Sequence, residues 1–160
     1  MTETKIDPIR NLQIIVAALF LGAGTFLAVV AFLTTTADEM PNPGGLGKIL
    51  LGVWAALVVG SLAVWPVVRN KQARLAVESM GAEAGDEGRS QALQHYSTTT
   101  IAGAALAEGC TLLAASGAFA THHVGLLLAG VVGLVGIVLL FPSQTKFERF
   151  LEHGISHRNV

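Results

Sequence analysis

The segment TTTIAGAALAEGCTLLAASGAFA, residues 98–120, decides the fold of this chain. A transmembrane helix needs about 20 mostly apolar residues, so we expect this segment to span a membrane. One acid, Glu108, lies about ten residues into it, roughly 15 Å along the helix from Thr98. A carboxyl group at that depth is costly, and such groups are often functional, so Glu108 is the leading functional candidate.

The composition agrees with a membrane protein. The chain has 160 residues, of which 52% are hydrophobic and 13% charged, whereas an average globular chain has roughly 25% charged residues. So much apolar surface excludes disorder as a general description and makes the lipid bilayer the expected surroundings. The net charge of -1 gives no field that attracts nucleic acid. The single cysteine, Cys110, excludes an intrachain disulfide, and we interpret it as a packing residue.

We predict an all-α fold, an integral membrane four-helix bundle that forms one domain. The expected spans cover about residues 12–33, 48–68, 98–120 and 124–141. A signal peptide is the alternative for the first span, but its apolar region exceeds the usual length of about 7–15 residues. Residues 40–47 are rich in Pro and Gly and predict a turn. Residues 69–95 form a long link, in which 70–80 has helical spacing.

The distribution of basic residues predicts the orientation. Nine of the ten Lys and Arg residues lie in the amino-terminal tail, the link 69–95 and the carboxyl-terminal tail 142–160, and only Lys48 lies on the other side. By the positive-inside rule, both termini and the link face the cytoplasm. The tail carries Phe147, Phe150 and Leu151 on one helical face, so we expect a helix on the membrane surface, with docking on a partner as the alternative.

Small residues at helical spacing occur in every span and can bring helices close together. The second span has Gly52, Ala56 and Gly60, and the fourth has Gly130, Gly133 and Gly136. We expect most of these stripes to pack within the bundle. An interface with a membrane-protein partner or with a second copy of the chain stays open.

Glu108 has two interpretations. We expect its carboxyl group to be protonated and to donate a hydrogen bond, with Thr25, Ser61 and Thr111 as possible partners. In the first interpretation, Glu108 is a structural tether that ties helices together in an accessory subunit. In the second, it is a reversible proton or sodium site. Both interpretations are kept.

Other candidate chemistry is weak. His122 and His123 are adjacent, and His153 and His157 are four residues apart, but neither pair has a third ligand, so we expect no metal site. The sequence has no phosphate-binding loop or nucleophile motif, and no second catalytic group accompanies Glu108. We therefore expect no enzyme and no cofactor.

Residues 99–109, Thr-Thr-Ile-Ala-Gly-Ala-Ala-Leu-Ala-Glu-Gly, resemble the carboxylate helix of the ATP synthase c subunit. This local resemblance covers about a dozen residues and implies that Glu108 carries a proton or a sodium ion. The same region, with Phe141-Pro142 after the fourth span, resembles an uncharacterised family of small four-transmembrane-helix bacterial proteins of the kind seen in planctomycetes. That resemblance implies the four-span fold and a multi-pass protein of the bacterial inner membrane.

Overall fold

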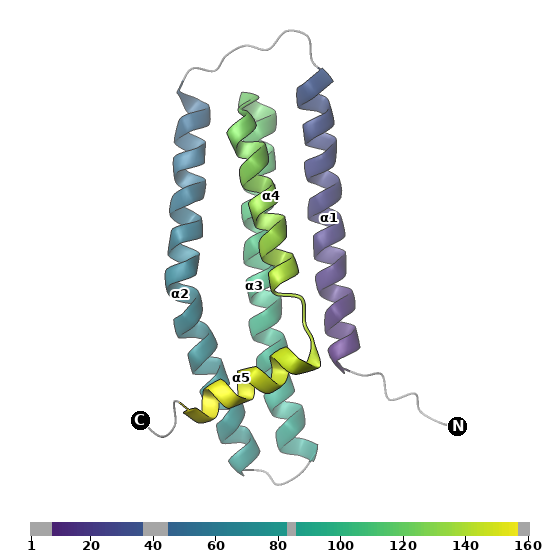
Figure 1. Ribbon diagram of the computed structural model, residues 1–160, viewed down its shortest axis with the longest axis vertical. Helices are drawn as coiled ribbons and strands as arrows, with labels where there is room; N and C mark the ends of the chain where they lie inside the picture. Colours follow the sequence, from purple (N-terminus) through teal and green to yellow (C-terminus); the bar gives the residue numbers. More distant parts are fainter. Residues whose placement is uncertain (1–7, 37–44, 83–85, 157–160) are drawn as a thin grey trace, which may run out of the picture. The chain divides into compact units, whose positions relative to one another are not determined.

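The computed structural model describes residues 8–36, 45–82 and 86–156, and these residues form an all-α protein (Figure 1). The helices are α1 (Pro8–Thr36), α2 (Leu46–Ala82), α3 (Asp86–Thr121), α4 (Val124–Leu139) and α5 (Gln144–Ser156). The predicted helical class is therefore confirmed. The turn expected at 40–47 lies largely outside the described residues, as does His157.

Three of these helices, α1, α2 and α3, are long and apolar enough to cross a membrane. The fourth predicted span, 124–141, ends as a helix at Leu139 and has 16 helical residues, about 24 Å. This helix meets the length and hydropathy expected of a membrane span only when it is taken together with α5, and the chain bends by 80° between the two helices. Pro142 lies between the two helices and has no N–H with which to continue the first. The described residues thus contain three candidate spans, or four if the bent pair counts as one.

Most of the predicted link 69–95 is helical. The second helix continues to Ala82 and the third begins at Asp86. Ala73, Ala76 and Val77 are buried at spacings of three and one along α2, which gives the extension a packed side. The helical spacing expected for residues 70–80 is therefore confirmed.

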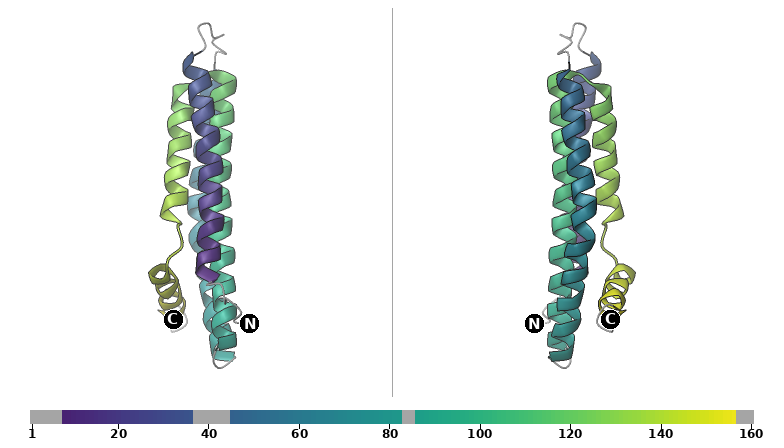
Figure 2. Two further views of the ribbon diagram at one scale, coloured as in Figure 1. Left: turned by 90° about the vertical axis from the view of Figure 1, so that its right-hand side faces the viewer. Right: turned by 90° about the vertical axis from the view of Figure 1, so that its left-hand side faces the viewer.

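The chain divides into two compact units. Unit 2 contains residues 18–62 and 104–140, which are parts of α1, α2 and α3 with the whole of α4 (Figure 2). Its core residues come from α1, α3 and α4, and they are Leu27, Val30, Ala115, Ala118 and Leu126. Many large side chains of this unit stay exposed, among them Val59 (66%) and Leu128 (65%), as expected of surfaces in contact with lipid.

The glycines of α4 pack within unit 2, as do Gly47 of α2 and Gly117 of α3. A Cβ atom added at Gly130 would lie 2.7 Å from a methyl group of Leu27, and one added at Gly133 would meet Thr111 and the backbone of α3. In contrast, nothing lies within 4 Å of a Cβ added at Gly52 or Gly60. The expectation of packing within the chain is thus fulfilled by α4 and not by these two glycines of α2.

A tight turn joins α3 to α4. His122 has φ = 50°, the left-handed region that non-glycine residues adopt uncommonly. His123 is extended and precedes the first residue of α4, and its carbonyl oxygen accepts a hydrogen bond from Leu126 N at 2.9 Å. The chain therefore reverses from α3 into α4 through two histidines.

Unit 1 contains residues 1–17, 63–103 and 141–160, of which the termini and residues 83–85 lie outside the described ranges. Its α2 and α3 segments lie side by side, and α5 crosses them (Figure 1). Phe147 and Phe150 of α5 are 3% and 5% exposed, and both rings pack against Tyr96 with centroids 5.3 and 5.4 Å away. The apolar face of the tail is therefore buried in the protein, so the favoured expectation of a helix on the membrane surface is corrected. The reason is that α2 and α3 extend far enough to cover these rings.

Candidate functional site

Glu108 lies on α3, in the part that belongs to unit 2. Its side chain is partly exposed, between the exposed Gly109 and the partly exposed Ala107. Within the described residues, its carboxyl group makes no hydrogen bond and no ion pair. An unsatisfied carboxyl group in an apolar helix is costly, so the arrangement calls for a bonding partner from outside this part of the chain.

Residues close to Glu108 on α3 make contacts with the neighbouring helices α4 and α2. A Cβ added at Gly136 of α4 would lie 3.4 Å from Ala107 Cβ, so α4 packs closely on this part of α3. On another side, the indole Nε1 of Trp54 donates a hydrogen bond to the Cys110 carbonyl oxygen at 3.1 Å. This hydrogen bond joins α2 to α3. These contacts fix α3 in unit 2 and leave the carboxyl group of Glu108 free.

The three polar side chains that were predicted to contact Glu108 lie elsewhere. Thr111 is fully buried, and its hydroxyl group donates to the Ala107 carbonyl oxygen at 2.9 Å. The Ser61 hydroxyl group donates to the Leu57 carbonyl oxygen at 2.7 Å, and Thr25 is exposed. The structure therefore brings none of the three into a hydrogen bond with Glu108. Serine and threonine in helices often bond to their own preceding turn, and sequence spacing alone does not exclude this.

Space for a partner exists beside the carboxyl group. Gly109 is exposed, and a Cβ placed on it would meet nothing within 4 Å. Ala105 and Leu106, one turn earlier, are also exposed. A small, uncovered helix surface next to a polar group is the arrangement by which membrane helices approach each other closely.

The histidine turn is the second polar feature of unit 2. The Nδ1 atoms of His122 and His123 are buried and have no hydrogen-bond partner among the residues that the structure describes. Among the described residues, no group of three or more His, Cys, Asp or Glu side chains is placed to hold a metal ion. Two imidazoles at a turn supply too few ligands for a structural zinc site.

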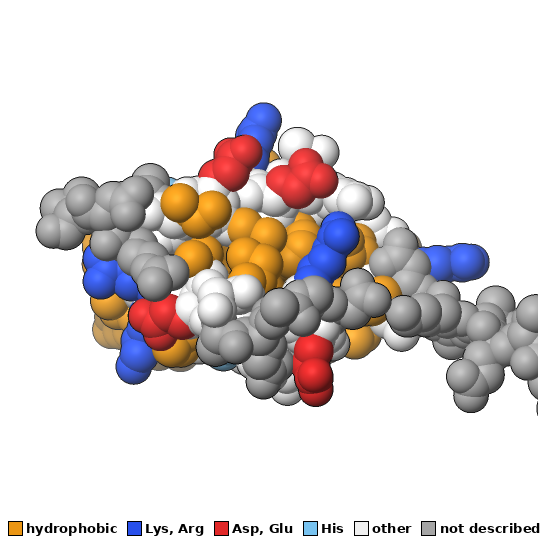
Figure 3. All heavy atoms as spheres, turned by 90° about the horizontal axis from the view of Figure 1, so that it is seen from below, with side chains coloured by type: hydrophobic (Ala, Val, Ile, Leu, Met, Phe, Trp, Pro, Cys, Tyr) orange, Lys and Arg blue, Asp and Glu red, His pale blue; other side chains and the backbone are white. Residues whose placement is uncertain are grey.

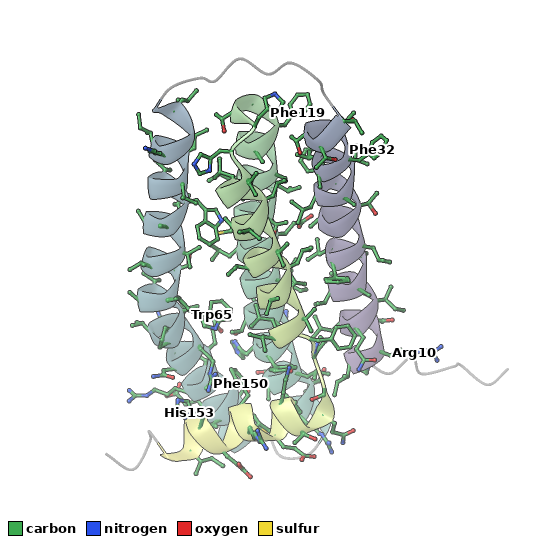
Figure 4. All side chains as sticks on the ribbon, turned by 45° about the horizontal axis from the view of Figure 1, so that its top comes forward. Arg10, Phe32, Trp65, Phe119, Phe150 and His153 are labelled. Carbon is green, nitrogen blue, oxygen red and sulfur yellow. The ribbon has the colours of Figure 1, made fainter. Side chains whose placement is uncertain are left out.

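Unit 1 holds polar contacts that the sequence did not reveal. His153 Nε2 of α5 lies 2.8 Å from Asn70 Oδ1, and His95 Nδ1 lies 2.8 Å from Gln72 Oε1 (Figure 4 labels Phe150 and His153 on α5). Burial raises the pKa of the Tyr96 phenol, partly offset by hydrogen bonds with Thr100 and the Ser143 backbone. The sequence offered one signal for these contacts. The neutral polar residues Asn70 and Gln72 stand close to the small residues Ala73 and Ala76 on the same helix. These contacts are structural in character, since they fasten α5 and α3 to α2.

Comparisons with protein-family models, with curated proteins and with solved structures find no match for this chain. Its classification therefore rests on what the helices themselves show. The chain is an all-α protein with three helices, or four with the bent pair, that are apolar and long enough to cross a membrane.

Proposed function

We propose that this chain is a non-enzymatic accessory subunit of a membrane assembly and that Glu108 ties it to a helix of a neighbouring chain. The observation that supports the proposal is the Glu108 carboxyl group, which has no partner within the described residues. In lipid such a group gains most from a hydrogen bond to another helix. This refines the tether that the sequence suggested, because the tie now joins two chains instead of two helices of one chain.

The proposal includes a four-span topology in the bacterial inner membrane, with both termini in the cytoplasm. It is supported by the strong Lys and Arg bias between the two sides of the spans. It is also supported by the resemblance of residues 100–109 and Phe141-Pro142 to small bacterial four-span proteins. In this topology α4 is the fourth span, and residues 142–160, which include α5, lie in the cytoplasm.

The tether is tested by replacing Glu108 and measuring which complex survives. Glu108→Gln keeps a donor and an acceptor of similar size, whereas Glu108→Leu keeps only the bulk. An interhelical hydrogen bond in a membrane contributes about 0.6–2 kcal/mol, so we expect Glu108→Leu to weaken association roughly 3–30-fold. The measurement is the yield of cross-linked or co-purified complex after mild detergent extraction. A complex that survives Glu108→Leu as well as Glu108→Gln would exclude the tether.

A reversible proton or sodium site is the second candidate. It is favoured by the same free carboxyl group together with the open space at Gly109, which leaves room for an ion. The local resemblance to the c subunit carboxylate helix supports it as well. Labelling with a hydrophobic carbodiimide separates the candidates in the intact assembly. An ion site reacts in a manner that depends on pH or sodium, whereas a carboxyl group held by a partner helix reacts only after the assembly is dissociated.

A further inference from the structure

The extension of α2 in unit 1 presents basic side chains on its outer surface. Lys71 and Arg74 are exposed, three positions apart, and share one face with the exposed Val67. The other side of α2 packs through Ala73 and Ala76, which are fully buried. The two basic groups therefore point away from the core of unit 1.

These basic groups are not used within the described part of the chain. Neither Lys71 nor Arg74 forms an ion pair with any described residue. This includes Glu78, which lies one turn after Arg74 on α2 and pairs with neither of them. The neutral polar residues between and beside them behave differently, because Asn70 and Gln72 are bonded to His153 and His95. Unit 1 thus bonds the neutral Asn70 and Gln72 internally and leaves the charged Lys71 and Arg74 exposed on its surface.

The position of these charges matches the headgroup layer of a bilayer. The apolar part of α2 ends at Val68, and the helix rises about 7.5 Å from Arg69 to Arg74. The headgroup region on each side of the hydrocarbon core is about 5–8 Å thick. Arg69 is also exposed and adds a third positive charge at its inner edge. Figure 3 shows both basic and acidic side chains around hydrophobic ones on the face of the molecule that is seen from below.

We propose that Lys71 and Arg74, flanked by Arg69, bind the phosphate groups of anionic phospholipids where α2 leaves the bilayer. Side chains three positions apart on a helix are neighbours, so the ammonium and guanidinium groups can converge on one phosphodiester. Charge complementarity favours an anionic lipid over a zwitterionic one, and basic residues beside a span act in this way. The proposal is independent of the role of Glu108, which lies in the other unit.

Trp65 provides a local reporter for the test. It lies on α2 six residues before Lys71, about 9 Å along the helix (Figure 4). With Trp54→Phe as the background, Trp65 is the sole tryptophan. The full chain is reconstituted with lipids whose acyl chains carry bromine, which quenches nearby indole fluorescence. Brominated phosphatidylglycerol is compared with brominated phosphatidylcholine, each diluted into the same unbrominated mixture.

The expected result is stronger quenching by the anionic lipid, with a preference that falls about fivefold for each charge removed by Lys71→Gln or Arg74→Gln. Arg89→Gln is the matched control, because Arg89 is exposed and lies nine residues, about 14 Å, before Thr98 on α3. It should leave the preference unchanged, and added salt should weaken the preference of the unmodified chain. Equal quenching by the two lipids would overturn the proposal, and so would an equal loss in Arg89→Gln, which indicates an effect of net charge alone.

Discussion

Replacing Gly133 by alanine tests the packing of α4 on α3. The added Cβ would collide with Thr111 Oγ1 and would lie 3.1 Å from the Ala107 carbonyl oxygen and from Thr111 N. Backbone atoms cannot move aside unless the helices separate. Overpacking of this kind costs about 1–3 kcal/mol, whereas alanine gains up to about 1 kcal/mol over glycine in a helix. We therefore expect a net loss of roughly 1–2 kcal/mol in the stability of unit 2.

Cys110 makes the assay simple, since it is the only cysteine and is buried in α3. A dye that fluoresces on reaction with thiols reports thermal unfolding of the detergent-solubilised protein. We expect the midpoint for Gly133→Ala to fall by about 3–8 °C. The matched control is Gly60→Ala, where the new Cβ meets nothing within 4 Å. If Gly133→Ala unfolds at or above the temperature of Gly60→Ala, the reasoning is refuted.

The nearest obstacle can also be removed from the opposite side. Thr111→Ala deletes the hydroxyl oxygen that the Gly133→Ala methyl group would strike, so the double variant should recover part of the lost stability. Simple addition of the two single effects would show that the contact between these positions is not the cause.

Three further predictions concern both units. Gly154→Ala should release α5, because the new Cβ would meet the backbone of α2, and the tail should then be cleaved faster by a protease. The control is Glu152→Ala at an exposed position of α5, which should be cleaved as slowly as the unmodified chain. Because the pKa of Tyr96 is raised, the folded state holds that proton more tightly, so unit 1 keeps its full stability below about pH 10 and loses it above. Tyr96→Phe should remove this loss of stability at alkaline pH, and the same proteolysis assay measures it. Trp54→Phe should lower the stability of unit 2 by about 1 kcal/mol through its lost hydrogen bond, seen as earlier exposure of the Cys110 thiol.

Hydropathy was sufficient to predict where the long helices lie. The expected spans 12–33, 48–68 and 98–120 fall inside α1, α2 and α3, and Pro142 follows the end of the fourth helix as expected. Spans in lipid must satisfy their backbone internally, so a long apolar run leaves few alternatives to a helix. The same argument gives no information about helix partners, because every span carries small residues at helical spacing.

The contacts between helices depended on tertiary structure. Phe147 and Phe150 give α5 an apolar face, but a bilayer surface and a protein surface satisfy such a face equally well. The burial of both rings against Tyr96 and the closeness of Gly154 to the Ala73 backbone show which one is used. Glu108 was identified from its chemistry, whereas the absence of a described partner for it became visible only when Ser61 and Thr111 were found bonded to their own helices.

The absence of burial in the most apolar part of α2 has a consequence for how this protein can vary. No residue in the most apolar window of α2 is buried, so neighbouring helices impose little on the shapes of its side chains there. Substitutions among Leu, Ile and Val in that window should be close to neutral as long as hydropathy is preserved. Homologous chains can then drift apart at most of these positions while folding alike, and percentage identity would understate how closely such chains are related.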